Sequence, residues 1–456
     1  MKNKLFICIA LILGSTLWMG AANPLKPDSP NIILILTDDQ GWSHVSKAMD
    51  PKEAESFSEY LSTPNINKLG DAGIRFTSGY APAPICTPTR RSILCGASAA
   101  RSGTEFRSEY VPADHMTIPR ALKKANPAYY CAHFGKWGEH MISTPEECGY
   151  DRSDGETGNH TGGMPNSLGV KAHDQGPDYF IDEENPKLTF SLTDSAIRFM
   201  NHAVKEKRPF YLQVSYYATH LSIVCKQETL LKYYRKGVPD RMYPRSFAAM
   251  LEDLDQGIGL LLDALDQSGV AENTYVVFMS DNGGQRFMPG NDESRKHLNA
   301  PLTDFKQSLY EGGIRVPFMV RGPGIKPGSY SHVPVVGYDL LPTFYELAGG
   351  KKKLPDEVDG GSIFSLFQNP ESGKVKRDAG ALIFHRPIKK SSSAVRQGSH
   401  KLMLSWNKEG EITDRHLYNL DDSVVESEET DIAGQNEEKA DQLQAILLDF
   451  LEALDN

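Results

Sequence analysis

The chain has 456 residues, of which 39% are hydrophobic, so it is long enough to form a large core and two or three domains. Its formal charge of -10 results from 49 basic and 59 acidic side chains, which excludes the broad basic surface that is typical of nucleic-acid-binding proteins. An anionic substrate would therefore have to be bound by a local group of cations.

The first residues are typical of an export signal. Lys2 and Lys4 precede an apolar run at residues 5–18, and small residues at positions 20–22 offer a cleavage site. A membrane anchor is the alternative, but the run is short for a bilayer span. We predict a signal peptide at residues 1–22, no later membrane-spanning segment, and a mature protein that is periplasmic or extracellular.

Removal of the signal peptide would take Cys8 with it and leave an odd number of cysteines. An odd number in an exported protein means that at least one thiol has a fate other than an intramolecular disulfide. Cys131 and Cys148 are close enough in sequence to pair, although spacing alone does not establish a disulfide. The remaining cysteines are Cys86, Cys95, Cys131, Cys148 and Cys225.

Short apolar runs alternate with helical patterns along the main part of the chain. Buried strands are predicted at residues 31–37, 210–216, 275–280 and 316–320. Residues 246–265 predict a helix, because apolar residues recur at three- and four-residue steps and Gly269 follows the last of them. This alternation favours a mostly parallel sheet with helices on both faces.

The composition changes near residue 350. Residues 349–361 are rich in Lys, Gly and Asp and predict a loop. Strand-like segments and a final helical pattern follow it, at residues 381–385, 400–405 and 438–454. We therefore predict a main domain at residues 23–370 and a smaller α+β domain with a short antiparallel sheet at residues 371–456.

Acidic and amide side chains follow two of the predicted strands. Asp38 and Asp39 follow the first strand, and Asp281 and Asn282 follow the third. Ligands of open α/β sheets bind beyond the carboxyl ends of the strands, where three converging carboxylates repel each other unless a cation neutralises them. Oxygen ligands favour Ca²⁺ or Mg²⁺. Ordinary turn or capping chemistry is the alternative, but the occurrence of both pairs at strand ends favours a metal site.

Cys86 begins the segment Cys-Thr-Pro-Thr-Arg, which ends at Arg90. An isolated cysteine is more often structural, and a five-residue pattern is weak evidence when it stands alone. The pattern Cys-x-Pro-x-Arg resembles the signature of the formylglycine-dependent sulfatases, in which a separate maturation enzyme oxidises the cysteine to an aldehyde during export. The family usually has Ser where this chain has Thr89, a departure that keeps the hydroxyl group.

Other segments resemble the same family, in the same order, over most of residues 31–350. They are residues 31–41 (NIILILTDDQG), 135–137 (GKW), 217–220 (YATH), 280–284 (SDNGG) and 306–317 (KQSLYEGGIRVP). The resemblance implies the alkaline-phosphatase-like α/β sandwich of the type I sulfatases, with a central, mostly parallel sheet. It also implies a smaller C-terminal domain, of which residues 417–420 would form a closing strand.

The resemblance assigns a role to each matched side chain. The ligands of Ca²⁺, with Mg²⁺ as the alternative, would be Asp38, Asp39, Asp281, Asn282 and the formylglycine made from Cys86. The catalytic residues would be Cys86, Arg90, Lys136, His220 and Lys306. Arg90 would hydrogen-bond the diol and the metal carboxylates. The two lysines would neutralise the sulfate, and His220 would act as the general acid.

Two departures from the family pattern affect the expected pocket. The family usually has a histidine directly after the tryptophan of Gly-Lys-Trp, where this chain has Gly138. The next histidine is His140, which we predict as a substrate-binding residue. Thr303 and Asp304 stand where the family commonly has an Arg-Gly pair, and this change would alter the surroundings of Lys306.

These features predict a sulfuric ester hydrolase, an arylsulfatase-like enzyme that attacks sulfur with the gem-diol of a formylglycine. Because exported enzymes meet sulfated polysaccharides, we expect a sulfated carbohydrate as substrate and the maturation enzyme as a protein partner. Two alternatives share the fold, a formylglycine phosphodiesterase or phosphonate monoester hydrolase and a non-catalytic carbohydrate-binding relative. The identity of the sugar would depend on loops such as residues 143–178.

Overall fold

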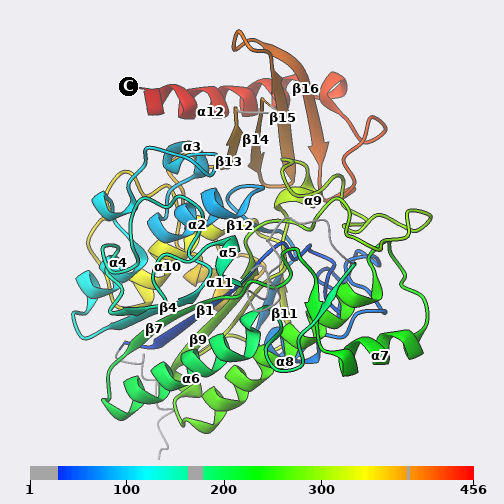
Figure 1. Ribbon diagram of the computed structural model, residues 1–456. Helices are drawn as coiled ribbons and strands as arrows, with labels where there is room; N and C mark the ends of the chain where they lie inside the picture. Colours follow the sequence, from blue (N-terminus) through cyan, green and yellow to red (C-terminus); the bar gives the residue numbers. More distant parts are fainter. Residues whose placement is uncertain (1–28, 163–177, 388–390, 456) are drawn as a thin grey trace, which may run out of the picture.

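An eight-stranded sheet forms the centre of the molecule, shown in the computed structural model of Figure 1, which describes residues 29–162, 178–387 and 391–455. The predicted signal peptide at residues 1–22, with Cys8, lies outside the described residues. None of the helices in the described part of the chain is long and apolar enough to cross a membrane.

The main sheet has the strand order β11-β2-β10-β9-β1-β7-β4-β5. Its strands are β1 (Asn31–Thr37), β2 (Ile74–Phe76), β4 (Tyr130–Gly135), β5 (Arg152–Ser153), β7 (Phe210–Ser215), β9 (Thr274–Ser280), β10 (Phe318–Arg321) and β11 (Ser329–Ser331). Of these described strands, β10 is the only one that runs antiparallel to its neighbours. The predicted mostly parallel sheet is therefore confirmed.

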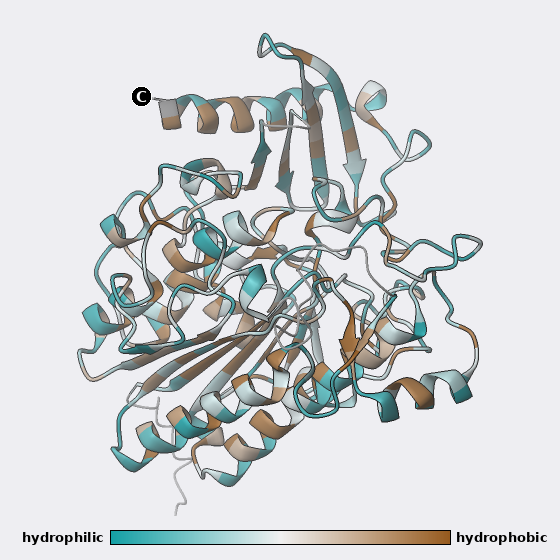
Figure 2. Ribbon diagram, viewed as in Figure 1, coloured by the Kyte–Doolittle hydropathy of each residue, from teal (hydrophilic) through white to brown (hydrophobic). Residues whose placement is uncertain are grey.

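Strand β1 lies at the middle of the sheet, where Leu34 is level with Gln213 of β7 and Val277 of β9. All seven residues of β1 are buried, because helices cover both faces of the sheet. A strand that is buried on both faces needs a continuous apolar run, which explains the sequence NIILILT. Figure 2 shows the hydrophobic colouring concentrated in these central strands.

Two layers of helices cover the sheet, and a separate hydrophobic cluster fills the space beneath each layer. One layer contains α1 (Pro64–Asp71), α6 (Thr189–Lys205), α7 (Gln227–Lys236) and α8 (Arg245–Gln267). The other contains α2 (Cys86–Cys95), α4 (Ile118–Ala125), α10 (Leu340–Leu347) and α11 (Phe364–Gln368). The helix predicted at residues 246–265 is α8, and Gly269 adopts a φ of +75° just beyond it.

Shorter elements complete the main part of the chain. They are β3 (Gly79–Tyr80), β6 (Phe180–Ile181), β8 (Val224–Cys225), β12 (Val335–Val336), α3 (Ala99–Ser102), α5 (Asn159–Gly162) and α9 (Glu311–Ile314). The described residues also contain 3-10 turns at Pro112–Asp114, Pro186–Leu188, Ala271–Asn273 and Gly337–Asp339, and one at Ala433–Gln435 in the C-terminal part.

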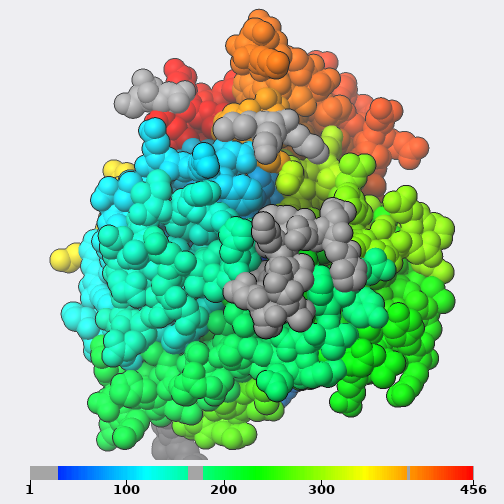
Figure 3. All heavy atoms as spheres, in the orientation of Figure 1, coloured from blue at the N-terminus to red at the C-terminus, as the bar shows by residue number. Residues whose placement is uncertain are grey.

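The C-terminal part is a four-stranded antiparallel sheet with one helix packed against it. Its elements are β13 (Leu382–Arg386), β14 (Ser392–Gln397), β15 (His400–Trp406), β16 (Ile412–Asn419) and α12 (Glu437–Asp455). Apolar residues of α12, such as Leu443 and Leu447, pack on one face of this sheet. This arrangement is the predicted α+β unit, and Figure 3 shows its orange and red surface resting on the larger body.

A buried ionic cluster joins the two parts of the chain. Lys401 of β15 is fully buried, and its Nζ donates to the carbonyl of Leu309 (2.8 Å) and to Glu311 Oε1 (2.8 Å). The same ammonium pairs with Glu426 Oε1 at 2.8 Å. The other oxygen of Glu311 accepts a hydrogen bond from Arg315 Nε (2.5 Å). The C-terminal part therefore holds residues 309–311, which lie three to five residues after Lys306.

Candidate active site

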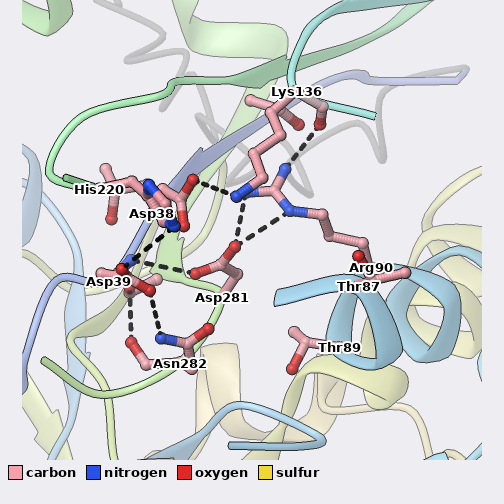
Figure 4. Close-up of polar contacts among 12 residues, drawn as sticks. Asp38, Asp39, Thr87, Thr89, Arg90, Lys136, His220, Asp281 and Asn282 are labelled. Carbon is pink, nitrogen blue, oxygen red and sulfur yellow. Dashed lines mark hydrogen bonds and ion pairs between the residues drawn. The ribbon is translucent and has the colours of Figure 1, made fainter. Parts of the chain in front are cut away.

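Four neighbouring parallel strands end at one edge of the main sheet, and a candidate residue or segment follows each of them. Asp281 follows β9, Asp38 follows β1 and Lys136 follows β4, while the segment after β7 carries His220. Because these strands run in one direction, their carboxyl ends meet, as they do in other open α/β sheets. Figure 4 shows the side chains converging there.

The acidic cluster is held by its own hydrogen bonds. The backbone N–H of Asp39 donates to Asp281 Oδ1 (3.1 Å), and Asn282 Nδ2 donates to Asp39 Oδ1 (2.7 Å). Asp39 has a φ of +60°, a conformation that Asp adopts more readily than most residues. Asp38, Asp39, Asp281 and Asn282 are all fully buried. The residues after β1 and those after β9 therefore form a single preorganised site (Figure 4).

This cluster has the properties of a cation site. Burial and the negative charge of Asp38 raise the pKa of Asp281 to about 7, so the third carboxylate is costly to ionise without a further positive charge. Among the described groups, none donates a hydrogen bond to Asp38 Oδ1 or to Asn282 Oδ1, although both oxygens are buried. Buried acceptors of this kind are normally satisfied by a partner, and a metal ion can be that partner.

Helix α2 brings Cys86 and Arg90 to the cluster. Cys86 is the first residue of the helix, and Arg90 lies one turn later on the same face. Arg90 Nε and Nη2 donate to Asp281 Oδ2 (3.0 and 2.6 Å), and Nη1 donates to the carbonyl of Lys136 (2.7 Å). One ligand atom each from Asp38, Cys86 and Asp281 lie within 4.8 Å of one another. Burial raises the pKa of the Cys86 thiol.

The hydroxyl group of Thr89, which stands where the family usually has serine, has a clear structural role. This hydroxyl donates to the carbonyl of Ala83 (2.9 Å) and accepts from the N–H of the same residue (3.2 Å). These two bonds hold the turn that precedes Cys86 against the helix. Serine carries the same hydroxyl group and could make the same two bonds.

Each of the first two carboxylates is paired with a buried lysine. Lys136 Nζ lies 2.5 Å from Asp38 Oδ2, and Lys306 Nζ lies 2.7 Å from Asp39 Oδ1. Burial alone would lower the pKa of each lysine, but the adjacent carboxylate more than offsets it and raises the pKa. Both ammonium groups are therefore charged, and they form the local group of cations that an anionic substrate would require.

His220 lies at the edge of the same cluster. Its Nε2 is 3.8 Å from Asp39 Oδ2, and its Nδ1 is 2.6 Å from the carbonyl of Leu221. We assign the proton to Nδ1, because a carbonyl oxygen can only accept. Nε2 then faces the site. Burial lowers the pKa of His220 to about 3, so the ring is neutral at pH 7.

A pocket of about 450 Å³ opens above Lys306 and His220. It is lined by Phe106, Glu139, His140, Asn159, His160, His220, Leu221, Gln285, Lys306 and Gln307. The predicted substrate residue His140 is exposed and has a φ of +54°. It therefore lines this pocket without belonging to the buried cluster. Residues 163–177 of the predicted specificity loop lie outside the described residues.

Gln285 contacts the cluster and Asn299 supports the loop beside it, and neither was predicted from the sequence. Gln285 Nε2 donates to Asp39 Oδ2 (2.6 Å). Asn299 Nδ2 donates to the carbonyl of Gly284 (3.1 Å), and the same carbonyl accepts from the N–H of Lys306 (2.9 Å). Gln285 directly follows the SDNGG segment, and its position next to this motif could have identified it from the sequence. The role of Asn299 depends on how two loops pack, which the sequence does not encode locally.

Lys187 is another buried residue near the cluster that the sequence did not reveal. It is 4% exposed, has a φ of +56° and donates from Nζ to the carbonyl of Ser222 (3.2 Å). Burial lowers its pKa to about 7, and the charge of Asp38 opposes this effect. No motif of the resemblance includes Lys187.

All five cysteines of the described chain are buried and free. The disulfide considered between Cys131 and Cys148 does not form. Cys131 lies in β4 and Cys148 in the loop after it, and both belong to the hydrophobic cluster on one face of the sheet. Burial raises the pKa of each thiol to about 12, which is typical of structural and unreactive cysteines.

Comparisons of the sequence and of the structure with known proteins agree on one family. A family model described as Sulfatase matches residues 30–350. A sulfatase from Formosa agariphila is 30% identical over 80% of this chain and 77% of its own length. N-acetylgalactosamine-6-sulfatase from Mus musculus is 29% identical over 77% of this chain and 68% of its own. The solved structure of Ps i-CgsB in complex with k-i-k-neocarrahexaose superposes with a TM-score of 0.72, at 27% identity over 91% of both chains.

Proposed function

This chain belongs to the sulfatase family of sulfuric ester hydrolases, and we propose that it removes sulfate from carbohydrates with a formylglycine made from Cys86. The observation that carries the proposal is the position of Cys86, which lies among buried carboxylates and two charged lysines. Two relatives support a carbohydrate substrate. One is named for N-acetylgalactosamine sulfate, and the other was solved with a neocarrahexaose.

A divalent cation is the expected cofactor, with Ca²⁺ as the first choice and Mg²⁺ as the alternative. Asp38, Asp39, Asp281 and Asn282 would hold it, because all four offer the hard oxygen atoms that these ions prefer. The unpartnered oxygens of Asp38 and Asn282 fit this assignment. When bound, the cation would neutralise the carboxylates and stabilise negative charge on oxygen near residue 86.

Residue 86 is the proposed nucleophile after oxidation of its thiol to an aldehyde. The hydrated aldehyde would supply one hydroxyl for attack on sulfur and a second hydroxyl through which sulfate could leave. Arg90 would orient this group, because its guanidinium is fixed by Asp281 and by the carbonyl of Lys136. An unmodified Cys86 would offer only a soft sulfur, which binds a hard cation poorly. It would also lack the two hydroxyl groups that attack sulfur and release sulfate.

The remaining groups neutralise the substrate and supply the proton. Lys136 and Lys306 would bind the sulfate oxygens as compact positive charges in a buried site, where electrostatic stabilisation is strong. His220 is the proposed general acid, because its Nε2 faces the site. Its pKa is about 3 because of burial, and the negative charge of a bound sulfate ester would raise it toward the working range.

Export is part of the same proposal. The charged start, the apolar run and the small residues before position 23 have the order of a cleavable signal peptide. An exported sulfatase would meet sulfated polysaccharides in the periplasm or outside the cell. A maturation enzyme would act on Cys86 during export, as the resemblance of residues 86–90 implies.

The test combines peptide mass spectrometry with a sulfate-release assay on the protein produced with a maturation enzyme. We expect the peptide that contains Cys86 to be about 18 Da lighter than the thiol form, since an aldehyde replaces the thiol. Sulfate release should disappear in Cys86→Ala and persist in Cys95→Ala, which changes a buried cysteine at the other end of α2. A matured aldehyde without activity on any sulfate ester would favour the non-catalytic alternative.

A further inference from the structure

The loop after Trp137 follows a path that excludes the usual family histidine. Gly138 has a φ of +145°, a conformation that residues with side chains rarely adopt. A Cβ atom added at Gly138 would lie 2.9 Å from Cγ of Met141. This position therefore has neither a histidine nor the space for one. The next residue, Glu139, lines the pocket in this part of the structure.

Glu139 is held on both sides by residues of the site. Its backbone N–H donates to Thr87 Oγ1 (2.9 Å), and Thr87 directly follows the proposed nucleophile. Its Oε1 accepts a hydrogen bond from the N–H of Asn159 (2.5 Å). The carboxylate is therefore fixed next to Asn159, and both residues line the pocket that contains Lys306 and His220.

Asn159 lines the same pocket and carries a buried acceptor. The residue is 9% exposed, and no described group donates a hydrogen bond to its buried Oδ1. A buried acceptor without a donor costs free energy, and a small movement of the side chain toward a bound ligand would relieve that cost. Glu139 and Asn159 together offer a carboxylate and an amide oxygen, which bind hydroxyl or N–H groups.

The charges around the pocket limit what these acceptors can bind. Among its described lining residues, Lys306 is the only lysine or arginine, and it belongs to the sulfate site. His140 and His160 are exposed on the same lining. A second sulfate or a carboxylate on the same sugar ring would meet the negative charge of Glu139, whereas a hydroxyl or an acetamido N–H would be bound by it.

We propose that Glu139 and Asn159 form a specificity subsite for the sugar that carries the sulfate. The subsite binds the hydroxyl or amide N–H donors of a neutral, monosulfated sugar and disfavours a second anionic group on that ring. The inference rests on the proposed sulfatase function, because it assigns the substrate class of the same pocket.

The test compares monosulfated and disulfated forms of the same sugar. The probes are the 6-sulfates and 4,6-disulfates of galactose and of N-acetylgalactosamine, and the readout is the ratio of kcat/KM for the two forms. Glu139→Gln should move this ratio at least about tenfold toward the disulfated form, because a charged acceptor is lost and repulsion is relieved. Asn159→Ala should lower kcat/KM for the monosulfated sugar by about tenfold. Glu109→Gln, an exposed residue outside the pocket lining, should leave the ratio unchanged.

A ratio that stays within about twofold in Glu139→Gln overturns the inference while the sulfatase function stands. A structural defect would lower both kcat/KM values together and leave the ratio unchanged. If the wild type hydrolyses none of the probes, the proposed function fails for them. Calorimetric binding to Cys86→Ala then decides the inference separately. Tenfold weaker binding of the monosulfated sugar after Glu139→Gln supports the subsite, and unchanged or absent binding overturns it.

Discussion

Replacement of Lys401 by methionine tests how strongly the C-terminal part is tied to the catalytic part. Lys401 is fully buried and serves three acceptors, the carbonyl of Leu309 and the carboxylates of Glu311 and Glu426. Methionine preserves most of the side-chain volume and removes the charge. The variant therefore isolates the ionic contribution from the packing contribution.

The size of the expected loss in stability depends on the partners that each carboxylate retains in the variant. Glu311 retains Arg315 as an ion-pair partner, whereas Glu426 retains the backbone N–H of Glu311. Removal of one partner from a buried ion pair costs about 3–5 kcal/mol, since the other charge stays buried without compensation. Burial raises the pKa of Glu426 to about 7 although Lys401 opposes this effect, so this carboxylate is ionised at pH 8 in the wild type. We expect Lys401→Met to lower the free energy of unfolding by about 3–5 kcal/mol at pH 8.

Urea unfolding at pH 8, followed by fluorescence, measures this change. The control is Lys353→Met, because Lys353 pairs with Asp356 on the surface and both side chains are about four-fifths exposed. That variant should change stability by less than about 0.5 kcal/mol. Combining Lys401→Met with Glu426→Gln should recover part of the loss. A loss below about 1 kcal/mol in Lys401→Met would refute the reasoning that this cluster is a strong buried ion pair.

Further predictions concern single residues of the site and of the domain contact. Thr89→Ala should cost about 1–3 kcal/mol in thermal unfolding, because both backbone groups of Ala83 lose a partner, whereas Thr89→Ser should be nearly neutral. Gly138→His should lower stability by about 1–3 kcal/mol and should fail to increase sulfate release, because the backbone there is left-handed. Asn282→Ala should weaken Ca²⁺ binding in equilibrium dialysis by at least about tenfold, since one of the proposed oxygen ligands is lost. Glu426 has a pKa of about 7 in the folded protein against 4.5 for an unperturbed group, so the folded state holds this proton more tightly than the unfolded chain. Its contribution to stability should therefore fall as the pH rises from 4.5 to about 7, and Glu426→Gln should remove that part of the dependence of Tm on pH.

The central strands could be predicted because each is buried on both faces and so needs an uninterrupted apolar run. Strands β1, β7 and β9 begin and end within one residue of the predicted ranges. Strand β10 begins two residues after the predicted start at residue 316, because Pro317 has no N–H to donate to a neighbouring strand. Strands β2, β5 and β11 are two or three residues long and show no period that a sequence pattern could reveal.

The candidate site also contains some residues that the sequence could predict and others that it could not. The carboxylates at Asp38 and Asp281 were visible in the sequence because they directly follow apolar runs. The glycine at position 138 was also visible as a departure, but its φ angle depends on the packed loop. Asn159 and Asn299 could not be predicted, because each acts through contacts between loops that are distant in sequence. Local patterns therefore located the strand-end residues and missed those that connect the loops.

The complete burial of Cys86 has a consequence for the order of events during synthesis. Side chains from several strand ends surround this residue, and β9 leaves the ribosome much later than residue 86. An enzyme that oxidises the thiol needs direct access to it, which the finished molecule does not allow. The proposed oxidation must therefore occur on the extended chain, between the emergence of residue 86 and the pairing of β9 with β1. Any condition that speeds folding relative to export would then yield stable protein that permanently carries an unoxidised cysteine.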